Sequence, residues 1–232
     1  MIKSGLLAVA NRRSAVPTPD ILWWKLNEGS GTSIAGSGSN GGDGGATDAD
    51  WLTGKNGSGY ALDFNGINDD ANTSASITYG TDKLTFCGWF YFDDITSTQV
   101  IMESSANWNS SSDSFLIYLD AGAFFAGLRD NGAKYRVESI TAPSVGSWVH
   151  LAVLLDFSSA TGRDVKIYVN AVEQSTTIST NYSPIARTFA AYKLYVGARG
   201  GTSLFFNGRI DDLRIYTGDK SADLTAIMND AQ

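Results

Sequence analysis

A series of short extended segments, separated by turn-forming residues, limits the possible folds of this chain more than any other feature of its sequence. In one segment the apolar residues Val165, Ile167 and Val169 alternate with less apolar ones, which is the period of two expected for a strand with one buried face. Similar segments recur through most of the chain between clusters of Gly, Asn, Asp and Ser, and no long amphipathic helix interrupts them. The sequence therefore predicts an all-β fold.

Two longer segments, Leu84–Phe92 and Trp148–Asp156, are apolar on both faces. Strands with two apolar faces are covered above and below, so we expect these two to be central strands of the core. The other expected strands cover residues 60–64, 114–119, 165–170, 193–196 and 210–216, with weaker candidates at 99–102 and 135–138.

One short helix is expected near the end of the chain, over Ser221–Met228. Ser221 is a residue type that caps helices, Asp223 places a negative charge in the first turn, and apolar residues follow at helical spacing. We expect this helix to dock on the β-structure.

The length of 232 residues suits a single β-sandwich domain, which we place at residues 20–232. The polar residues 1–19 precede the first expected strand and contain Pro17 and Pro19, so we interpret them as an N-terminal arm. The arm either docks on another subunit or partner, or lies along its own domain. The Gly-, Ser- and Asn-rich segment from Gly29 to Gly59 is interpreted as a long surface loop within the domain.

The formal net charge of −7 disfavours partners that carry phosphate, because binding to nucleic acid or to an anionic membrane depends on clustered Lys and Arg. The sequence contains no such cluster. No run approaches the roughly 20 apolar residues that span a bilayer, so we do not expect membrane insertion. The apolar stretch after Met1 is shorter than the core of a secretion signal, and Arg12 and Arg13 follow it.

The chain has one cysteine and one histidine, which excludes an intrachain disulfide and a zinc site built from paired thiolates. Cys87 lies in an apolar run and is expected to be a buried, inert thiol. In a strand, His150 shares a face with Trp148, Ala152 and Leu154, so we expect a packed histidine with a satisfied nitrogen rather than a general base.

Glycoside hydrolysis needs two carboxyl groups that flank the scissile bond, about 5 to 5.5 Å apart in a retaining enzyme. The four glutamates Glu28, Glu103, Glu138 and Glu173 are scattered through the sequence. We therefore assign no catalytic residue and expect the protein not to be an enzyme.

Six segments, in order, carry a family resemblance over about residues 21–230. They are Trp24–Gly31, Gly59–Gly66, Leu84–Phe90, Gly146–Val153, Val165–Asn170 and Gly208–Tyr216. Through these segments the chain resembles a laminin G-like domain of the concanavalin A-like lectin and glucanase superfamily. The resemblance implies two stacked antiparallel sheets in a jelly-roll sandwich, with loops at one rim that often bind calcium and glycans.

The chain departs from the family pattern at Ala171, where glycine is common. A two-residue type I′ turn needs positive φ at both central residues, and alanine resists that conformation. We therefore expect this hairpin to turn through a longer loop.

A calcium site is the metal hypothesis that the resemblance suggests. In a regular strand Asp211 shares a face with Leu213 and Ile215, so its carboxylate would lie at the edge of the core and need a partner. Calcium, which takes six to eight oxygen ligands, and an arginine are both suitable partners. The resemblance implies that Asn27 and Asn65 could converge with Asp211 on a structural Ca²⁺ ion; the alternative is a hydrogen-bonded or salt-bridged Asp211 without metal.

Glycan sites combine an aromatic ring with amides and carboxylates. Trp108 lies in a polar loop with Asn107, Asn109 and Asp113, and we interpret these four residues as a candidate ligand-binding set. The alternative is a loop tryptophan that anchors itself on the sandwich. Trp51 and Tyr182 are weaker candidates.

Two functional hypotheses from different classes remain. The first is a non-catalytic binding or adhesion module that recognises a glycan or a cell surface, which the lectin-like scaffold favours. The second is a structural subunit of a larger assembly, such as a virion decoration, fibre or tail protein, anchored to other subunits through residues 1–19; the lack of a convincing signal peptide favours it. Either would act outside the cell or on a particle surface.

Overall fold

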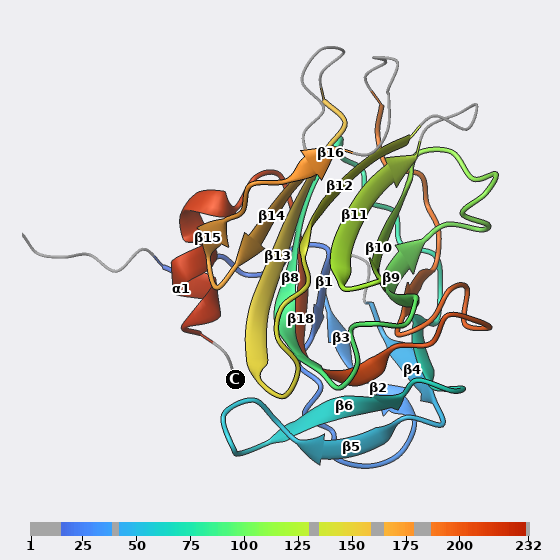
Figure 1. Ribbon diagram of the computed structural model, residues 1–232, viewed down its shortest axis with the longest axis vertical. Coiled ribbons are helices and arrows are strands. Elements are labelled where there is room, and N and C mark those ends of the chain that lie inside the picture. The colour runs from blue at the N-terminus through green and yellow to red at the C-terminus, as the bar shows by residue number, and fades with distance from the viewer. Residues whose placement is uncertain (1–14, 39–41, 130–134, 159–164, 179–186, 231–232) are drawn as a thin grey trace, which may run out of the picture.

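A computed structural model of the chain describes residues 15–38, 42–129, 135–158, 165–178 and 187–230. Two antiparallel sheets pack face to face in a jelly-roll sandwich (Figure 1), which confirms the predicted fold class. Sheet A contains β1 (Leu22–Trp24), β3 (Gly36–Ser37), β5 (Asp50–Thr53), β6 (Tyr60–Asn65), β8 (Lys83–Phe92), β13 (Trp148–Asp156), β14 (Val165–Val169), β15 (Val172–Glu173) and β18 (Asn207–Thr217). Sheet B contains β2 (Ser33–Ile34), β4 (Gly44–Thr47), β7 (Asp70–Thr73), β9 (Gln99–Ser104), β10 (Ser114–Asp120), β11 (Ala123–Arg129), β12 (Tyr135–Thr141), β16 (Thr177–Ile178) and β17 (Leu194–Val196).

The order of sheet A is β15-β14-β13-β8-β18-β1-β3, with β6 added along β18 and β5 added to β6. The order of sheet B is β16-β12-β11-β10-β9-β17-β7-β4-β2. The two strands predicted to be central, β8 and β13, pair over their full lengths in the middle of sheet A. Side chains from their inner faces, such as Phe86, Phe90 and Leu151, are buried in the core between the sheets.

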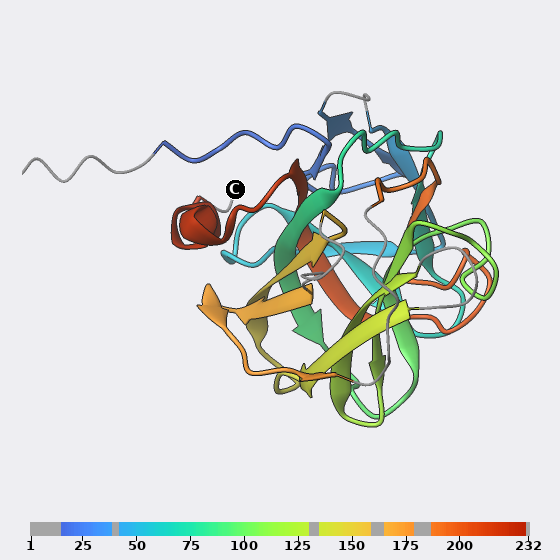
Figure 2. The same cartoon turned by 90° about the horizontal axis from the view of Figure 1, so that it is seen from above.

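A second, smaller apolar cluster explains why β8 and β13 are also apolar on their outer face. The C-terminal helix, made of a 3₁₀ turn η1 (Ser221–Asp223) and α1 (Leu224–Met228), lies over this face of sheet A (Figure 2). Leu224 and Ile227 pack there against residues that include Cys87, Ala152 and Tyr216. The predicted docking helix is confirmed, and no helix in the described ranges is long and apolar enough to cross a membrane.

The predicted cap of the helix by the Ser221 side chain is wrong, because that side chain makes no cap hydrogen bond. Instead the Ser221 N–H donates to Asp219 Oδ1 at 2.8 Å, two residues earlier in the chain. This bond holds the start of the 3₁₀ turn, and it differs from the expected cap, in which the Ser221 hydroxyl would accept an N–H two or three residues later.

The last part of the N-terminal arm follows its own domain. Val16 packs against the cluster under the helix, and the Asp20 carboxylate accepts the N–H of Thr217 at 2.9 Å and also its hydroxyl. Residues 1–14, on which the docking hypothesis mainly depends, lie outside the described residues.

The glycine-rich segment between Gly29 and Gly59 lies within the domain as expected, but its described residues do not form one long loop, so that part of the interpretation was wrong. It forms the four short strands β2 to β5, which extend both sheets. Gly44 packs so closely on Trp24 that an added Cβ atom would lie 2.4 Å from the indole ring. Trp24 Nε1–H also donates to the carbonyl of Gly42 at 2.6 Å. The small residues are needed here for close strand packing, which composition alone cannot distinguish from flexibility.

The β14–β15 hairpin has a two-residue turn, so the longer loop expected at Ala171 was also wrong. Val169 pairs with Val172, and the two residues between them have positive φ, 49° at Asn170 and 63° at Ala171. Asn170 is tied to β13, because its N–H donates to the His150 carbonyl and its side chain accepts the His150 N–H. These contacts hold a turn that Ala171 alone disfavours.

A β-bulge in β18 reverses the expected orientation of Asp211. Asp211 pairs with Trp89 and Arg214 pairs with Cys87, so two residues of β18 face one residue of β8, and Asp212 has a φ of 52°. Because a bulge shifts the alternation by one residue, Asp211 lies on the outer face of sheet A while Leu213 points into the core. The prediction that they share a face was wrong.

Candidate functional site

A polar cavity of about 350 Å³ lies on the outer face of sheet B, beside the predicted ligand-binding residues. Leu194 and Val196 point into the core, so Tyr195 and its cross-strand partner Glu103 lie on the opposite, outer face. Two loops close the cavity over Glu103, one after β9 and one after β17. Its lining consists of Glu103, Ala106, Asn107, Trp108, Asn109, Arg199, Gly200, Thr202 and Ser203.

Glu103 connects the two loops from beneath. Its side chain is buried; one carboxylate oxygen accepts the Ser105 hydroxyl, and the other accepts the N–H of Gly200 at 3.0 Å. The backbone of Trp108 adds a further hydrogen bond. Burial raises the pKa of Glu103, whereas the Ser105 bond and the Arg199 charge oppose that rise. The residue is thus an internal clamp with its oxygens already engaged.

The loop after β9 is shaped by its own polar side chains. Ser111 Oγ accepts the N–H groups of Ala106 and Asn107 at 3.0 and 2.8 Å. Asn107 Oδ1 in turn accepts the Asn109 N–H at 2.9 Å. Asn and Ser favour such side-chain-to-backbone turns, which fix the loop and leave Trp108 half-buried at the cavity.

The opposite wall is a tight turn. The Arg199 N–H donates to the Ser203 carbonyl at 2.7 Å, and the Thr202 N–H donates to the Arg199 carbonyl at 3.1 Å. Gly200 and Gly201 between them have φ values of 56° and 71°, a conformation that favours glycine.

Three of the four predicted ligand-binding residues, Asn107, Trp108 and Asn109, line this cavity together. Asp113 does not join them, because it lies in a separate shallow cavity where its carboxylate pairs with Arg187 at 3.4 Å. Sequence reasoning missed the clamp Glu103 and the arginine of the opposite turn. Their participation depends on strand pairing between segments about 100 residues apart, for which no local pattern exists.

Of the two weaker candidates, only Trp51 lies among the described residues, and its ring is engaged within the fold. Trp51 packs against the core, and its Nε1–H donates to the Gly31 carbonyl at 2.8 Å. Tyr182 lies outside the described residues.

The three predicted calcium ligands are not brought to one point. Asp211 Oδ2 accepts the Lys55 N–H at 2.9 Å and Asn27 Oδ1 accepts the Tyr60 N–H at 3.1 Å, so these two residues hold the two ends of the β5–β6 turn. Asn65 lies at the other end of β6, roughly 17 Å from Tyr60 at the usual rise of a strand.

The three residues therefore do not fit a single calcium ion. The Asn65 side-chain oxygen accepts the N–H groups of Ile67 and Asn68 within its own turn. Within the part of the chain that the structure describes, no three His, Cys, Asp or Glu side chains gather as a metal-binding group.

Asp211 lies beside Trp89 and His150 on the outer face of sheet A. Its Oδ1 atom is buried without a hydrogen-bond partner among the described residues, and the Lys55 ammonium lies 3.6 Å from the centroid of the Trp89 ring. Burial raises the pKa of Asp211 to about 7, against the hydrogen bond from the Lys55 N–H.

His150 lies on the predicted face and contacts Trp89 edge-to-face, with ring centroids 5.3 Å apart. Its Nδ1 atom is buried without a partner in the described ranges, so the satisfied nitrogen expected from the sequence is wrong for this atom. Burial, followed by the charges of Arg214 and Lys55, lowers the pKa of His150 to about 3. The ring is therefore neutral near pH 7.

Comparison with known families gives a match over residues 64–223 to the model described as the concanavalin A-like lectin/glucanases superfamily. This match covers more than half of the chain. No curated protein matches the sequence.

Solved structures of botulinum neurotoxin binding domains share the fold. The binding domain of botulinum neurotoxin DC in complex with rat synaptotagmin II has a TM-score of 0.68 and 10% identity, covering 92% of this chain and 52% of that one. A botulinum neurotoxin type C structure, whose title reports cell entry dependent on two ganglioside molecules, has a TM-score of 0.65 and 12% identity, covering 92% and 52%. The type G receptor binding domain has a TM-score of 0.63 and 12% identity, covering 90% and 50%. The chain spans about half the length of these structures, and the low identities show the shared fold alone.

Proposed function

The chain belongs to the concanavalin A-like lectin/glucanase superfamily, and from this premise we propose that it is a non-catalytic binding module that recognises a glycan at the cavity between the β9 and β17 loops. The observation that carries the proposal is the position of Trp108, a half-buried ring in the wall of a polar cavity. A sugar offers an apolar face to such a ring and hydroxyl groups to the neighbouring amides.

The cavity is built to keep its shape before a ligand arrives. Ser111 fixes the first loop, the turn at Gly200 and Gly201 fixes the second, and Glu103 joins them. Side-chain amides of Asn107 and Asn109 and the exposed Thr202 side chain add polar groups at the cavity. Such a preorganised site saves the entropy of ordering its loops on binding.

A glycosidase is the competing function on this scaffold, and the arrangement of carboxylates speaks against it. Glu103, Glu138 and Glu173 lie on the separate strands β9, β12 and β15, and Glu28 lies outside a strand. Among the residues that the structure describes at the cavity, Glu103 is the one glutamate, and it already accepts hydrogen bonds at both carboxylate oxygens. A retaining glycosidase needs a second carboxyl group about 5 to 5.5 Å away.

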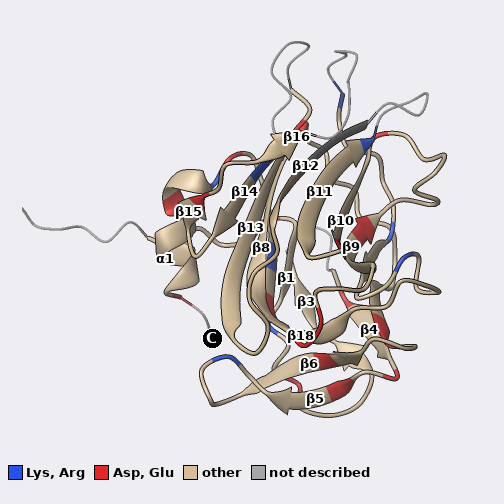
Figure 3. Cartoon of the chain, viewed as in Figure 1, with Lys and Arg blue, Asp and Glu red and all other residues tan. Residues whose placement is uncertain are grey.

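The names of the similar structures describe receptor and ganglioside binding by those toxins, and they make a binding role natural for the shared sandwich. We expect a ligand on a cell surface and a site of action outside the cell. The alternative of an assembly subunit receives no support from these similarities. Figure 3 shows the basic residues of the described part dispersed over several strands and loops, which fits a partner other than nucleic acid.

Structural calcium stays a proposal from the sequence, and thermal unfolding can test it. If calcium binds at Asp211, millimolar Ca²⁺ raises the Tm relative to a chelator, and the variant Asp211→Asn loses that rise. Equal Tm values in Ca²⁺ and chelator would end the proposal. A rise that persists in the variant would place the ion away from Asp211.

A glycan array with the full chain tests the proposed function. We expect binding to a subset of glycans, and we expect Trp108→Ala to weaken it at least about fivefold, as for a central aromatic contact. Tyr60→Ala, an exposed aromatic on β6, is the matched control and should bind like the wild type. An array without any bound glycan, or glycan binding that Trp108→Ala leaves unchanged, would contradict the proposal.

A further inference from the structure

We infer that the ligand of this cavity is an acidic saccharide, whose carboxylate or sulfate group pairs with the guanidinium of Arg199. The inference rests on the proposed function, because it names the chemical class of glycan for the same site. It comes from the guanidinium of Arg199 in the cavity lining, which a neutral sugar would leave without an ion pair.

Arg199 lines the cavity, and its hydrogen bonds within the described residues are made by its backbone. The N–H and carbonyl close the turn with Ser203 and Thr202. No ion pair joins its side chain to a described carboxylate at hydrogen-bonding distance. A guanidinium carries five N–H donors in a planar fork, which matches the two oxygens of a carboxylate or sulfate.

Glu103 interacts with Arg199 from beneath the cavity. The Arg199 charge lowers the pKa of Glu103, so the two side chains interact electrostatically. Both Glu103 oxygens, however, are occupied by Ser105 and Gly200. Glu103 is therefore a positioning residue: it holds the turn that carries Arg199 but leaves the donors of the guanidinium for a ligand.

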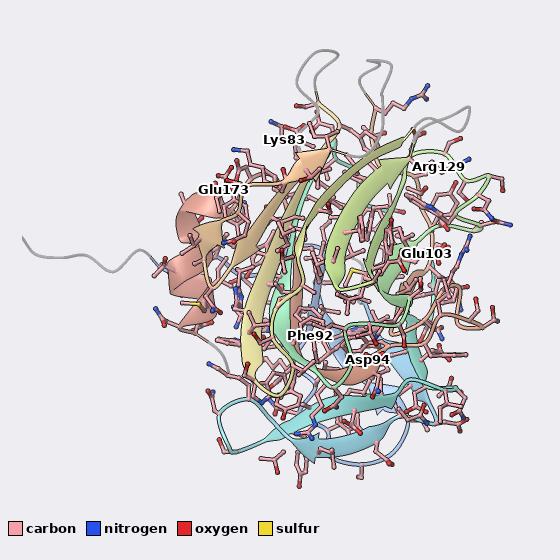
Figure 4. The ribbon with its side chains drawn as sticks, in the orientation of Figure 1. Lys83, Phe92, Asp94, Glu103, Arg129 and Glu173 are labelled. Carbon is pink, nitrogen blue, oxygen red and sulfur yellow. The ribbon has the colours of Figure 1, made fainter. Side chains whose placement is uncertain are left out.

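A second guanidinium lies under the same loop. Arg129 is only 7% exposed and donates through one terminal NH₂ group to the carbonyl of Asn109, a residue of the cavity wall. Its Nε atom has no partner and its charge pairs with no carboxylate among the described residues. Figure 4 shows Arg129 and Glu103 on the same side of the molecule, on β11 and β9 of sheet B, which are separated by β10.

Arg199 is thus the arginine of the cavity lining, and Arg129 lies beneath the same loop. The carboxylates nearby are Glu103, whose oxygens are engaged, and Asp70, whose Oδ2 atom lies next to Gly201 and accepts the Asn72 side-chain amide. Because the Arg199 guanidinium has no ion pair with a described carboxylate, an anionic group on the ligand gains more here than a hydroxyl group would.

The test compares three probes that share one neutral core: lactose, 3′-sialyllactose, which adds a carboxylate, and lactose 3′-sulfate. Calorimetry with the full chain should give at least about tenfold tighter binding for one or both acidic probes than for lactose. The preference should shrink when the salt concentration is raised from 50 to 300 mM, roughly as expected for partly exposed charges.

Arg199→Gln should bring the affinities for the acidic probes to within about twofold of the lactose affinity measured in the same variant. Arg199→Lys should keep part of the preference, since it retains the charge without the fork. Lys193→Gln, the same charge change at a residue outside the cavity lining, is the matched control and should behave like the wild type.

The outcomes separate the inference from the proposed function. Equal affinities for lactose and both acidic probes, all weakened by Trp108→Ala, would overturn the acidic ligand and leave the glycan site in place. A preference that survives in Arg199→Gln would also overturn it. If none of the three probes nor any glycan of a wider array binds, the proposed function fails and the inference fails with it.

Discussion

The Glu103 carboxylate accepts the backbone N–H of Gly200 at 3.0 Å, joining two segments that lie 97 residues apart in the sequence. This one bond ties the turn after β17 to the loop after β9, because the other carboxylate oxygen accepts the Ser105 hydroxyl. Both loops form the walls of the cavity that we assign to a glycan, and Glu103 joins them from beneath.

Replacing Glu103 tests the clamp. Glu103→Ala removes the acceptor of the Gly200 N–H and of the buried Ser105 hydroxyl, and should lower the free energy of unfolding by about 1–3 kcal/mol. Glu103→Gln keeps an oxygen for Gly200 and an N–H group for Ser105, so we expect a much smaller loss. Urea unfolding measures both, and hydrogen exchange at the Gly200 amide should accelerate in Glu103→Ala alone. Equal stability of wild type and Glu103→Ala would show that the clamp contributes nothing.

Asp211 and His150 should give opposite pH dependences of stability. The folded pKa of Asp211 is about 7, above its ordinary value of 3.8, so its contribution is present below pH 3.8 and is lost as the pH rises toward 7. The folded pKa of His150 is about 3, below its ordinary 6.5, so its contribution is present above pH 6.5 and is lost as the pH falls toward 3. Each gives a slope of up to about 1.4 kcal/mol per pH unit, with opposite signs.

Between about pH 4 and 6.5 these two slopes cancel in the wild type, whose stability we expect to be nearly flat from this source. Asp211→Asn should expose the histidine slope, so that the variant becomes less stable as the pH falls. His150→Gln should expose the aspartate slope, so that the variant gains stability as the pH falls. Urea midpoints at four pH values check this, and parallel pH profiles for the three proteins would contradict it.

The turn at Ala171 predicts a stabilising substitution. Alanine with a φ of 63° is strained, and glycine is not, so Ala171→Gly should raise the free energy of unfolding by about 0.5–1 kcal/mol. Ala75→Gly, at an exposed alanine without positive φ, should instead lower stability by a similar amount. Thermal unfolding of both variants decides the matter; destabilisation by both would mean that the turn is not strained.

We expect the loss of Arg214 alone to destabilise the protein more than the loss of both charges of the Asp212–Arg214 ion pair. Both side chains are buried, and the guanidinium meets the carboxylate with two bonds of 2.8 and 2.7 Å. Arg214→Met leaves a buried carboxylate without its counter-ion and should lower the free energy of unfolding by about 3–5 kcal/mol. The double variant Asp212→Asn with Arg214→Met should lower it by less. A double-mutant cycle in urea measures the coupling, and strictly additive losses would contradict this account.

The sequence predicted those parts of the fold that local patterns determine. β8 and β13 were found because apolar residues on both faces require cover on both sides, and α1 was found from its spacing. β2 to β5 were missed because they are short and glycine-rich, and they are strands only through their pairing with neighbours. The orientation of Asp211 was wrong because a single extra residue at Asp212 reverses the alternation that the prediction assumed.

For the same reason, only part of the candidate site could be predicted from the sequence. A tryptophan among Asn and Ser residues marks an exposed aromatic, so Asn107, Trp108 and Asn109 could be found from the sequence. Asp113 was included because it is near in sequence. It has a φ of 54° just before the next strand, and its carboxylate pairs with Arg187 outside the cavity. Glu103 and Arg199 could not be found, because sheet pairing alone brings them to the tryptophan.

The most direct test of the glycan site is a nuclear magnetic resonance titration of the ¹⁵N-labelled chain with the tightest glycan of the array. We predict that the largest shifts occur at the indole N–H of Trp108 and the amides of Asn109, Arg199 and Gly200, with small shifts elsewhere. Saturable shifts concentrated on sheet A, for example around Trp23, with the Trp108 signals unmoved, would contradict the account.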